Sequence, residues 1–412
     1  MIRILFIWPP KVEYIFSIQK HYTNFGETIS FLDQDGDFSI DVMDGSALLY
    51  FQWDFIEAYS KEYSYLIVYT DLHNAISSIK AAQQCKAISP KTITISYGQG
   101  TPYAPKTFLE EGFDAAITDP MYHISIKNFI LFKEGKLKSS DLRGIHYKEN
   151  SEIIEINEKH MLDVSKVSFP SLKKLPISQY KKISGRDQIC FTVSRGCSFP
   201  CRFCRAPLDQ GTNVSYRNLP DTLDYVEEVK DNYSSIKFIA ASFTENRDWV
   251  MELCESIITR NLSFKWIATT RLELVDDELL RDMSKAGCIA IAFGLETLYT
   301  ETQSNVDKNL PQNLVEKQVR LMHDNNIIPK AFIMLGIPGQ SQLEINEMYG
   351  FLKRNKVEIR PKEYYPYHQL LNSHKKIELL RKFERESSYN NLIPGVSSLQ
   401  FVKWLTDRTS VR

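Results

Sequence analysis

The sequence lacks an excess of charge of either sign and any long uncharged hydrophobic run. Its 412 residues carry 50 Lys and Arg against 51 Asp and Glu, a formal net charge of −1. This balance gives no excess of positive charge with which to bind nucleic acid or an anionic membrane surface. No segment approaches the ~18 uncharged residues of a membrane span, and the apolar start is followed by Trp8-Pro9-Pro10, not by a small-residue cleavage site. We therefore expect a soluble, cytoplasmic protein that partners neither nucleic acid nor membrane.

Cysteine is scarce, and its pattern excludes a disulfide framework. There are seven cysteines, an odd number, and three of them, Cys197, Cys201 and Cys204, fall within eight residues. In a reducing compartment such a group more often binds metal or does redox work. The other four are scattered, and we expect them to be buried core thiols.

The first 140 residues alternate short β-rich runs with helical stretches, which predicts a Rossmann-like, doubly wound α/β sheet. The expected strands are 3–8, 38–44, 65–70, 92–97 and 115–118. Sheets of this kind bind ligands beyond the carboxyl ends of their strands. The residues at those ends are mostly small, polar, glycine or proline, and they either let a ligand approach closely or simply form turns. Among them are Trp8, Pro10, Thr70, Ser96, Tyr97, Gly98, Gly100 and Asp119.

The mixed-charge segment 141–185 is expected to be a linker, and strand–helix alternation resumes after it. The expected strands are 189–193, 236–240, 263–268, 290–293, 330–335 and 363–365. Six strand–helix units fit a partial (β/α)6 barrel over residues 186–370, followed by a short segment, 371–412. In such barrels the chemistry lies at the carboxyl ends of the strands.

The three grouped cysteines directly follow the first strand of this second part. Three thiolates at spacings of four and three residues suit one compact loop around an iron–sulfur cluster. Zinc normally takes four ligands, and no fourth Cys or His lies nearby at finger spacing. Three ligands on a four-iron cluster would leave one iron open for a substrate or cofactor. The loop is therefore a candidate metal centre.

At these residues the sequence resembles the radical S-adenosylmethionine (SAM) superfamily. The cysteines have the family's Cys-x-x-x-Cys-x-x-Cys spacing, with the usual aromatic residue, Phe203, before the last one. Further blocks similar to the family's lie at 216–220, 266–271, 277–288, 293–297 and 335–341. Together with the preceding α/β domain, the layout is similar to the cobalamin-binding branch, whose members often begin with a strand ending in Pro-Pro, as here at Pro9-Pro10.

The resemblance implies three cofactors: a 4Fe–4S cluster, SAM and cobalamin. The cluster would bind SAM at its open iron and cleave it to a 5′-deoxyadenosyl radical, which would abstract hydrogen from an unactivated carbon. Methylcobalamin, held by residues 1–140, would then supply a methyl group. The implied enzyme is a C-methyltransferase acting on a small biosynthetic molecule, with a flavodoxin or ferredoxin as electron donor.

The resemblance also implies roles for individual residues. The cluster ligands would be Cys197, Cys201 and Cys204, and cobalamin would contact the strand-end residues named above. The SAM contacts would be Phe203, Ser242, Arg271, Glu296, Gly336 and Ile337. Tyr367 and His368 are candidate catalytic residues near the substrate. The alternatives are a plain loop histidine and tyrosines that only pack the barrel rim.

Two features depart from the family pattern. The strand end at 238–244 has alanines where relatives commonly carry acidic residues, so Ser242, Thr244 or Glu245 would contact the amino group of SAM. His73 follows the third strand rather than the first, and we expect a surface or helix-start residue rather than a cobalt ligand. The loop 8–14 would instead cover the lower face of the cobalt.

Other functional classes stay open at this point. The same cysteine loop serves radical enzymes that do not methylate, such as epimerases, cyclases or enzymes that transfer another fragment of SAM. A non-catalytic cobalamin-binding sensor is a further alternative, although no DNA-binding motif or output domain is visible. A tRNA methylthiotransferase is disfavoured, because residues 1–180 contain only Cys85 and no basic RNA-binding appendage is present.

Overall fold

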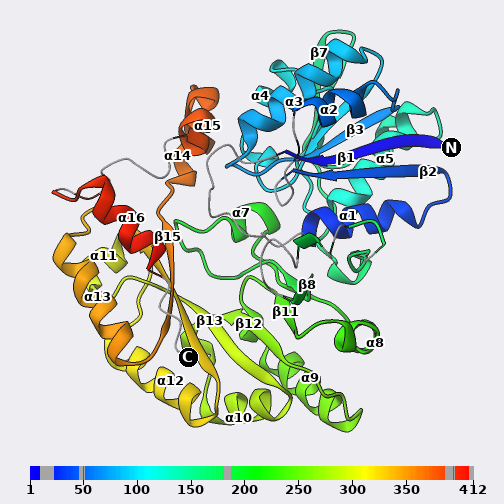
Figure 1. Ribbon diagram of the computed structural model, residues 1–412. Helices are drawn as coiled ribbons and strands as arrows, with labels where there is room; N and C mark the ends of the chain where they lie inside the picture. Colours follow the sequence, from blue (N-terminus) through cyan, green and yellow to red (C-terminus); the bar gives the residue numbers. More distant parts are fainter. Residues whose placement is uncertain are drawn as a thin grey trace. The chain divides into compact units, whose positions relative to one another are not determined.

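The computed structural model describes most of the chain, which divides into two compact units (Figure 1). The described residues are 1–9, 23–45, 50, 52–171, 173–175, 177, 179–180, 187–385, 393 and 395–407. The first unit comprises residues 1–186, 209–211 and 368–386, and the second comprises residues 187–208, 212–367 and 387–412. Within the described ranges, no helix combines the length and the apolar character that crossing a membrane requires.

The first unit is built on a seven-stranded sheet in the order β2-β1-β3-β4-β5-β6-β7. Its parallel strands are β1 (Ile2–Trp8), β2 (Phe38–Asp44), β3 (Tyr65–Tyr69), β4 (Ile93–Tyr97) and β5 (Ala115–Ile117). Every residue of β3 is buried, as expected for a parallel strand covered on both faces. The chain order reverses between β1 and β3, where sheets of this type bind ligands.

Helices cover both faces of this sheet (Figure 1). They are α1 (Thr23–Asp33), α2 (Gln52–Tyr59), α3 (Ala75–Ile88), α4 (Pro105–Glu110) and α5 (Tyr122–Lys133), and α15 (Lys376–Arg385), from late in the chain, belongs to the same unit. α1 packs against α5, whereas α3 packs against both α2 and α15. The Nζ atom of Lys376 also donates a hydrogen bond to the Tyr103 carbonyl at 2.9 Å. The Rossmann-like fold expected for this part of the chain is confirmed.

Residues 145–156, predicted as part of a linker, instead add two strands to this sheet. β6 (Ile145–Glu149) pairs antiparallel with β5, and β7 (Glu152–Ile156) pairs antiparallel with β6. Asn150 and Ser151 join them with φ angles of +49° and +70°, the geometry of a two-residue hairpin. β7 is a half-exposed edge strand with charged residues between apolar ones, and this mixed charge made the segment look like a linker.

The second unit is built on a six-stranded sheet in the order β15-β14-β13-β12-β11-β8, in which all neighbours are parallel. The strands are β8 (Gln188–Thr192), β11 (Ser235–Ile239), β12 (Trp266–Thr270), β13 (Cys288–Glu296), β14 (Ile328–Leu335) and β15 (Glu358–Glu363). The helices between them are α8 (Leu219–Val229), α9 (Arg247–Thr259), α10 (Asp277–Lys285), α12 (Gln312–Asp324) and α13 (Gln342–Arg354). These helices lie along one side of the sheet, which confirms the predicted partial (β/α)6 barrel (Figure 1).

The last strand differs most from its prediction, because β15 lies over 358–363 and not over 363–365. Its sequence alternates charged and apolar residues and contains Pro361, which is tolerated at a sheet edge. The smaller elements of this unit are β9 (Ser194–Arg195), β10 (Ser215–Tyr216), α11 (Thr300–Ser304) and α16 (Ser398–Thr406), and α7 (Ala206–Gln210) begins in it. α14 (Tyr367–Asn372) follows β15.

Candidate active site

The three predicted cluster ligands lie on one loop that follows β9. Cys197 is buried, and Cys201 and Cys204 are half-buried. The Cys204 amide donates to the Cys201 carbonyl at 3.0 Å, which folds the second half of the loop into a turn. Gly196 begins the loop with a φ of +88°, and a Cβ there would lie 2.0 Å from the carbonyl oxygen of Asn213. Only glycine therefore allows the loop to pass so close to the chain leading into β10.

A backbone amide and a guanidinium donate hydrogen bonds to two of the sulfur atoms of this loop. The Ala206 amide donates to the Cys204 Sγ at 3.4 Å, and the Arg271 Nη1 donates to the Cys201 Sγ at 3.2 Å. Such contacts stabilise thiolate ligands and tune the metal that they hold. Burial raises the pKa of Cys204 to about 11, so the free thiol is protonated at neutral pH. A bound cluster would hold the deprotonated form instead.

The three thiols are spread around the loop. Within the described part of the chain, no three Cys, His, Asp or Glu side chains gather closely enough to hold a single metal ion. A four-iron cluster takes its ligands at separate corners, so one compact loop with three half-buried or buried thiols and nearby donors fits such a group.

Arg271, a predicted SAM contact, belongs to the surroundings of the cysteine loop. Its guanidinium lies over the Phe199 ring, 3.9 Å from the centroid, and forms an ion pair with Glu273. From the other side, the Ser198 amide donates to the Glu245 Oε1 at 3.0 Å. The ends of β11 and β12 therefore both hold the cysteine loop.

Glu296, the predicted ribose contact, ends β13 at a β-bulge and has a φ of +65°. Its side chain is buried, and its Oε1 lies 2.3 Å from the position that a Cβ on Gly294 would occupy. A larger residue at 294 would require this carboxylate to shift from its position. Burial raises the pKa of Glu296 to about 7, although Lys308 and Arg271 act in the opposite direction. The group is an acceptor suited to vicinal hydroxyls.

The predicted SAM contacts Gly336 and Ile337 lie in the turn after β14. The Gly336 amide donates to the Gln340 Oε1 at 2.8 Å, and the Gln340 Nε2 donates to the Met334 carbonyl at 3.0 Å. Ile337 is buried in an apolar cluster against which Phe203 packs. The structure thus brings the residue beside the last cysteine and the turn after β14 into one cluster, and their contact with SAM stays a prediction.

Ser242, predicted to contact SAM, follows β11. It is 1% exposed, and its Oγ has no hydrogen-bond partner among the described residues. Thr244, the alternative, is already engaged, because its Oγ1 lies 2.5 Å from the Oγ1 of Thr270. A buried hydroxyl without a partner favours Ser242 over Thr244 as a ligand contact.

The tyrosines after β15 have different environments. Tyr364 belongs to the apolar cluster with Ile337. The Tyr365 hydroxyl donates to the Glu363 Oε2 at 2.6 Å, and the Tyr365 and Tyr367 rings stack with centroids 5.7 Å apart. Tyr367, a predicted catalytic residue, also lies against the Arg205 guanidinium, at 5.3 Å. His368 is the second predicted catalytic residue. The structure describes its backbone, in α14, but not its side chain.

In the first unit, the ends of β3 and β4 form a closely packed polar group. The Ser96 Oγ donates to the Thr70 Oγ1 at 3.1 Å and lies 2.8 Å from the Thr101 Oγ1. A Cβ on Gly98 would lie 2.8 Å from the Thr70 carbonyl oxygen, and one on Gly100 would lie 2.7 Å from the backbone of Asp71. Gly98 and Gly100 therefore allow the loops after β3 and β4 to pack closely against each other. The contact of these two glycines with cobalamin stays a prediction.

The other predicted cobalamin contacts of the first unit differ in what they touch. The buried Trp8 ring packs on Tyr69, with centroids 4.7 Å apart, and its Nε1 has no partner among the described residues. Tyr97 is buried beside the same Tyr69 ring, at 5.3 Å. Asp119 accepts hydrogen bonds from the Met121 amide at 2.7 Å and from the His160 amide at 2.9 Å. Its carboxylate is thus engaged within the domain.

Two further sequence expectations concern the loop after β1 and His73. Pro10 and the rest of the loop after Pro9 lie outside the described residues. The His73 amide donates to the Asp71 Oδ1 at 2.7 Å, just before α3 begins. This placement agrees with the expected helix-start residue.

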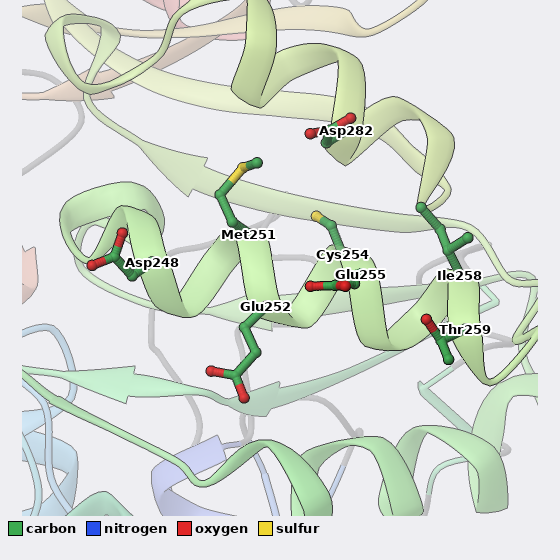
Figure 2. Close-up of a pocket in the computed structure, with 8 residues that line it drawn as sticks. All are labelled: Asp248, Met251, Glu252, Cys254, Glu255, Ile258, Thr259 and Asp282. Carbon is green, nitrogen blue, oxygen red and sulfur yellow. The ribbon is translucent and has the colours of Figure 1, made fainter.

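A separate groove of about 490 Å³ lies between α9 and α10 (Figure 2). Its lining includes none of the predicted site residues. It is lined by Asp248, Met251, Glu252, Cys254, Glu255, Ile258, Thr259 and Asp282.

Comparisons with known proteins bear on the site. The model of the Radical SAM superfamily matches residues 191–352. An uncharacterized methyltransferase of Pyrococcus horikoshii is 22% identical over 284 residues, which are 66% of this chain and 60% of the relative. The solved structure of TsrM from Kitasatospora setae, a radical S-adenosylmethionine methyltransferase, matches with a TM-score of 0.71 at 14% identity, over 88% of this chain and 72% of TsrM. OxsB, a cobalamin-dependent S-adenosylmethionine radical enzyme, matches with a TM-score of 0.70 at 16% identity, over 92% and 56% of the two chains.

Residues 191–352 therefore match a radical SAM domain, and the chain shares its fold with TsrM over 88% and with OxsB over 92% of its length. The predicted fold class is confirmed, and residues 191–352 match the predicted superfamily. The predicted enzyme class and the predicted cofactors, a 4Fe–4S cluster, SAM and cobalamin, agree with the same comparisons. The chain spans 60% of the length of the Pyrococcus relative.

Proposed function

We propose that the protein is a cobalamin-dependent radical SAM methyltransferase that methylates an unactivated carbon of a small molecule. The observation that carries this proposal is the packing of Phe203, from the cysteine loop, against the apolar cluster that contains Ile337 of the turn after β14. This contact joins the cluster ligands and the predicted SAM contacts at the carboxyl end of one sheet, where barrels of this kind carry their chemistry.

In this proposal each part of the site has its own task. The three cysteines hold the cluster, and Arg271 and the Ala206 amide donate to two of their sulfur atoms. Ser242 and Glu296 present buried oxygen acceptors to SAM. When bound, the cluster supplies the electron that cleaves SAM, and cobalamin supplies the methyl group. The apolar packing around Ile337 keeps water from the reacting groups.

The first unit supports cobalamin binding through its fold. Its strand order places the switch point between β1 and β3, and the buried hydroxyls of Thr70 and Ser96 lie beside it. TsrM has been solved with cobalamin and a 4Fe–4S cluster bound. A flavodoxin or ferredoxin would supply the electron, and a small molecule with an unactivated carbon would be the substrate.

Anaerobic reconstitution with iron and sulfide tests the cluster assignment. We expect about four irons per chain in the unaltered protein, with reductive cleavage of SAM to 5′-deoxyadenosine. Cys201→Ala should lose both the iron and the cleavage. Cys254→Ala, which changes a buried thiol on α9, should keep both. Equal iron binding by Cys201→Ala and the unaltered protein would contradict the cluster assignment.

A titration with hydroxocobalamin and an analysis of products test the rest of the proposal. Methyl transfer consumes two molecules of SAM and yields both 5′-deoxyadenosine and S-adenosylhomocysteine. A non-methylating radical enzyme yields no S-adenosylhomocysteine, and a sensor cleaves no SAM. If the protein bound the cluster but no cobalamin, this result would be compatible with radical SAM cleavage but would contradict the proposed cobalamin-dependent methyl transfer.

A further inference from the structure

The loop that follows α11, residues 305–308, contacts the candidate site with consecutive side chains. The Asn305 Nδ2 donates to a backbone carbonyl of the turn after β14 at 2.8 Å. Val306 is fully buried in the apolar cluster of that turn. Asp307 forms an ion pair with Arg202 of the cysteine loop, with 3.1 Å between its Oδ2 and the arginine Nε. Lys308, the next residue of the loop, therefore lies beside the site.

A buried glutamine fixes this loop from within. Gln303 is 2% exposed, and its Nε2 donates to the carbonyls of Thr297 at 2.9 Å and of Leu310 at 3.0 Å. Its Oε1 accepts from the Leu310 amide at 2.8 Å, and its backbone carbonyl accepts from the Lys308 amide at 3.0 Å. Both ends of the loop are thus tied to the residue that follows Glu296, so the backbone of Lys308 has a defined place.

The side chains of Lys308 and Glu296 converge over Gly294. They are 6% and 5% exposed. A Cβ on Gly294 would meet the Glu296 Oε1, and it would lie 3.3 Å from the Lys308 Nζ. Within the described part of the chain, neither an ion pair nor a hydrogen bond joins the two groups, and no donor reaches the Glu296 carboxylate. A buried cation and a buried carboxylate therefore face one another without direct contact.

The charged groups around Glu296 come from three elements. Lys308 comes from the loop after α11, Arg271 from the end of β12, and Cys204 from the cysteine loop. The neighbouring strand β14 pairs only uncharged residues with this end of β13. Burial raises the pKa of Glu296 to about 7, and Lys308 is the stronger of the two cations that lower it. A thiolate at Cys204 acts in the opposite direction. In this buried setting, a charge held so near has a strong effect.

We propose that Lys308 is a positioning residue, whose ammonium keeps the Glu296 carboxylate charged over Gly294 so that it accepts hydrogen bonds from the ribose hydroxyls of SAM. The inference rests on the proposed function, because Glu296 is the predicted ribose contact. A charged carboxylate accepts at both oxygens, whereas a protonated one is also a donor. Since Lys308 makes no hydrogen bond to this carboxylate, it stabilises the charge and leaves the oxygens open to the ligand.

Infrared titration of the cluster-reconstituted full chain, without SAM, tests the charge of Glu296 directly. The absorption of its protonated carboxyl group is the difference between the unaltered protein and Glu296→Gln. We expect Lys308→Met to move the midpoint of this titration upward by about one pH unit or more, because a nearby cation is lost. Lys308→Arg, which keeps the cation, should keep the midpoint. Lys308→Gln provides a second neutral variant if Lys308→Met fails to fold.

Binding of SAM to the same unreduced protein tests the consequence for the ligand. At pH 7, an upward move of one pH unit lowers the charged fraction of Glu296 about five-fold. We therefore expect Lys308→Met to weaken SAM binding about five-fold at pH 7 and to regain affinity at about pH 9. In a Glu296→Gln background, Lys308→Met should produce no such pH dependence. Lys353→Met, which removes a half-exposed cation paired with Asp407 on α13, should leave the profile unchanged.

A merely structural role for Lys308 gives a different result. Lys308→Met would then weaken SAM binding by the same factor at every pH and leave the infrared midpoint where it is, and either observation would overturn the inference. The infrared midpoint needs no bound SAM, so it also separates this inference from the proposed function. A shifted midpoint in a protein that holds its iron but binds no SAM would support the control of Glu296 by Lys308 and contradict the SAM site itself.

Discussion

Glu363, at the end of β15, is a buried carboxyl group whose ionisation opposes folding. It is 7% exposed, and its Oε1 has no hydrogen-bond partner among the described residues. Burial raises its pKa from an ordinary 4.5 to about 7, and the hydrogen bond from Tyr365 offsets part of this rise. Between about pH 4.5 and 7, the folded protein holds a proton that the unfolded chain has lost. Stability therefore falls as the pH rises through this window.

Replacing Glu363 by Gln should remove this pH dependence. A shift from 4.5 to about 7 corresponds to roughly 3 to 4 kcal/mol at ~1.4 kcal/mol per pKa unit. Because pH 5 already lies inside this window, we expect the free energy of unfolding, from urea titrations at pH 5 and pH 7.5, to fall by about 2 kcal/mol less in Glu363→Gln than in the unaltered protein. Glu252→Gln, at an exposed site on α9, should follow the unaltered protein. Parallel profiles for all three proteins would contradict the assignment.

Single residues were predictable where their role depends on neighbours in the sequence. The cysteine spacing and the block around Glu296 are local patterns, and the structure places them at one end of one sheet. Glu363 and Arg205 were missed, because their importance comes from burial and from contacts with Tyr365 and Tyr367 that no spacing reveals. Glu363 could have been noticed in the sequence only because it directly precedes a segment that contains three tyrosines.

The β6–β7 hairpin carries a local conformational cost in its turn. Asn150 and Ser151 both have positive φ angles, which asparagine tolerates better than serine and which glycine adopts freely. The hairpin forms the free edge of the first sheet, so its turn can change without disturbing the buried strands β1 to β5.

We expect Ser151→Gly to raise the free energy of unfolding by roughly 1 kcal/mol, because it relieves the left-handed serine. The same replacement at Ser256, inside α9, should lower it by roughly 0.5 kcal/mol, since glycine is a poorer helix former than serine. Urea denaturation of both variants measures the two changes. If Ser151→Gly were destabilising to the same degree as Ser256→Gly, this result would contradict the assignment of a two-residue turn with a left-handed Ser151.

Whole elements were predictable where apolar residues run continuously or alternate regularly, and the prediction failed at β7 and β15. β3 is a continuous, fully buried apolar run, and the edge strand β2 carries Phe38, Ile40 and Val42 at alternate positions, so the positions of both follow from hydrophobicity. β7 and β15 are edge strands that mix charged and apolar residues, and their sequences are typical of linkers.

At the scale of the whole molecule, the two units divide the proposed cofactors between them. The cysteine loop, Ser242, Glu296 and Ile337 all belong to the second unit. The strand ends at Thr70 and 96–100 belong to the first. A ligand that binds only the folded form protects the structure around its site, so each cofactor should leave its own pattern of protection.

Hydrogen exchange measured by mass spectrometry should resolve these two patterns. We expect hydroxocobalamin to slow exchange in segments 70–72 and 96–101, by up to about 100-fold at a concentration 100 times its dissociation constant. With the cluster in place, SAM should slow exchange in segments 197–204 and 334–340. Segment 247–259, which forms α9, lines the groove of Figure 2 and should respond to neither.

Cys201→Ala provides the matched control for this experiment. It should lose the protection caused by SAM and keep the protection caused by hydroxocobalamin, because the two sets of residues lie in different units. Cobalamin protection that is missing from 70–72 and 96–101 would show that the first sheet does not bind this cofactor, whatever the cluster does. SAM protection that survives in Cys201→Ala would separate SAM binding from the cysteine loop and contradict the site built on it.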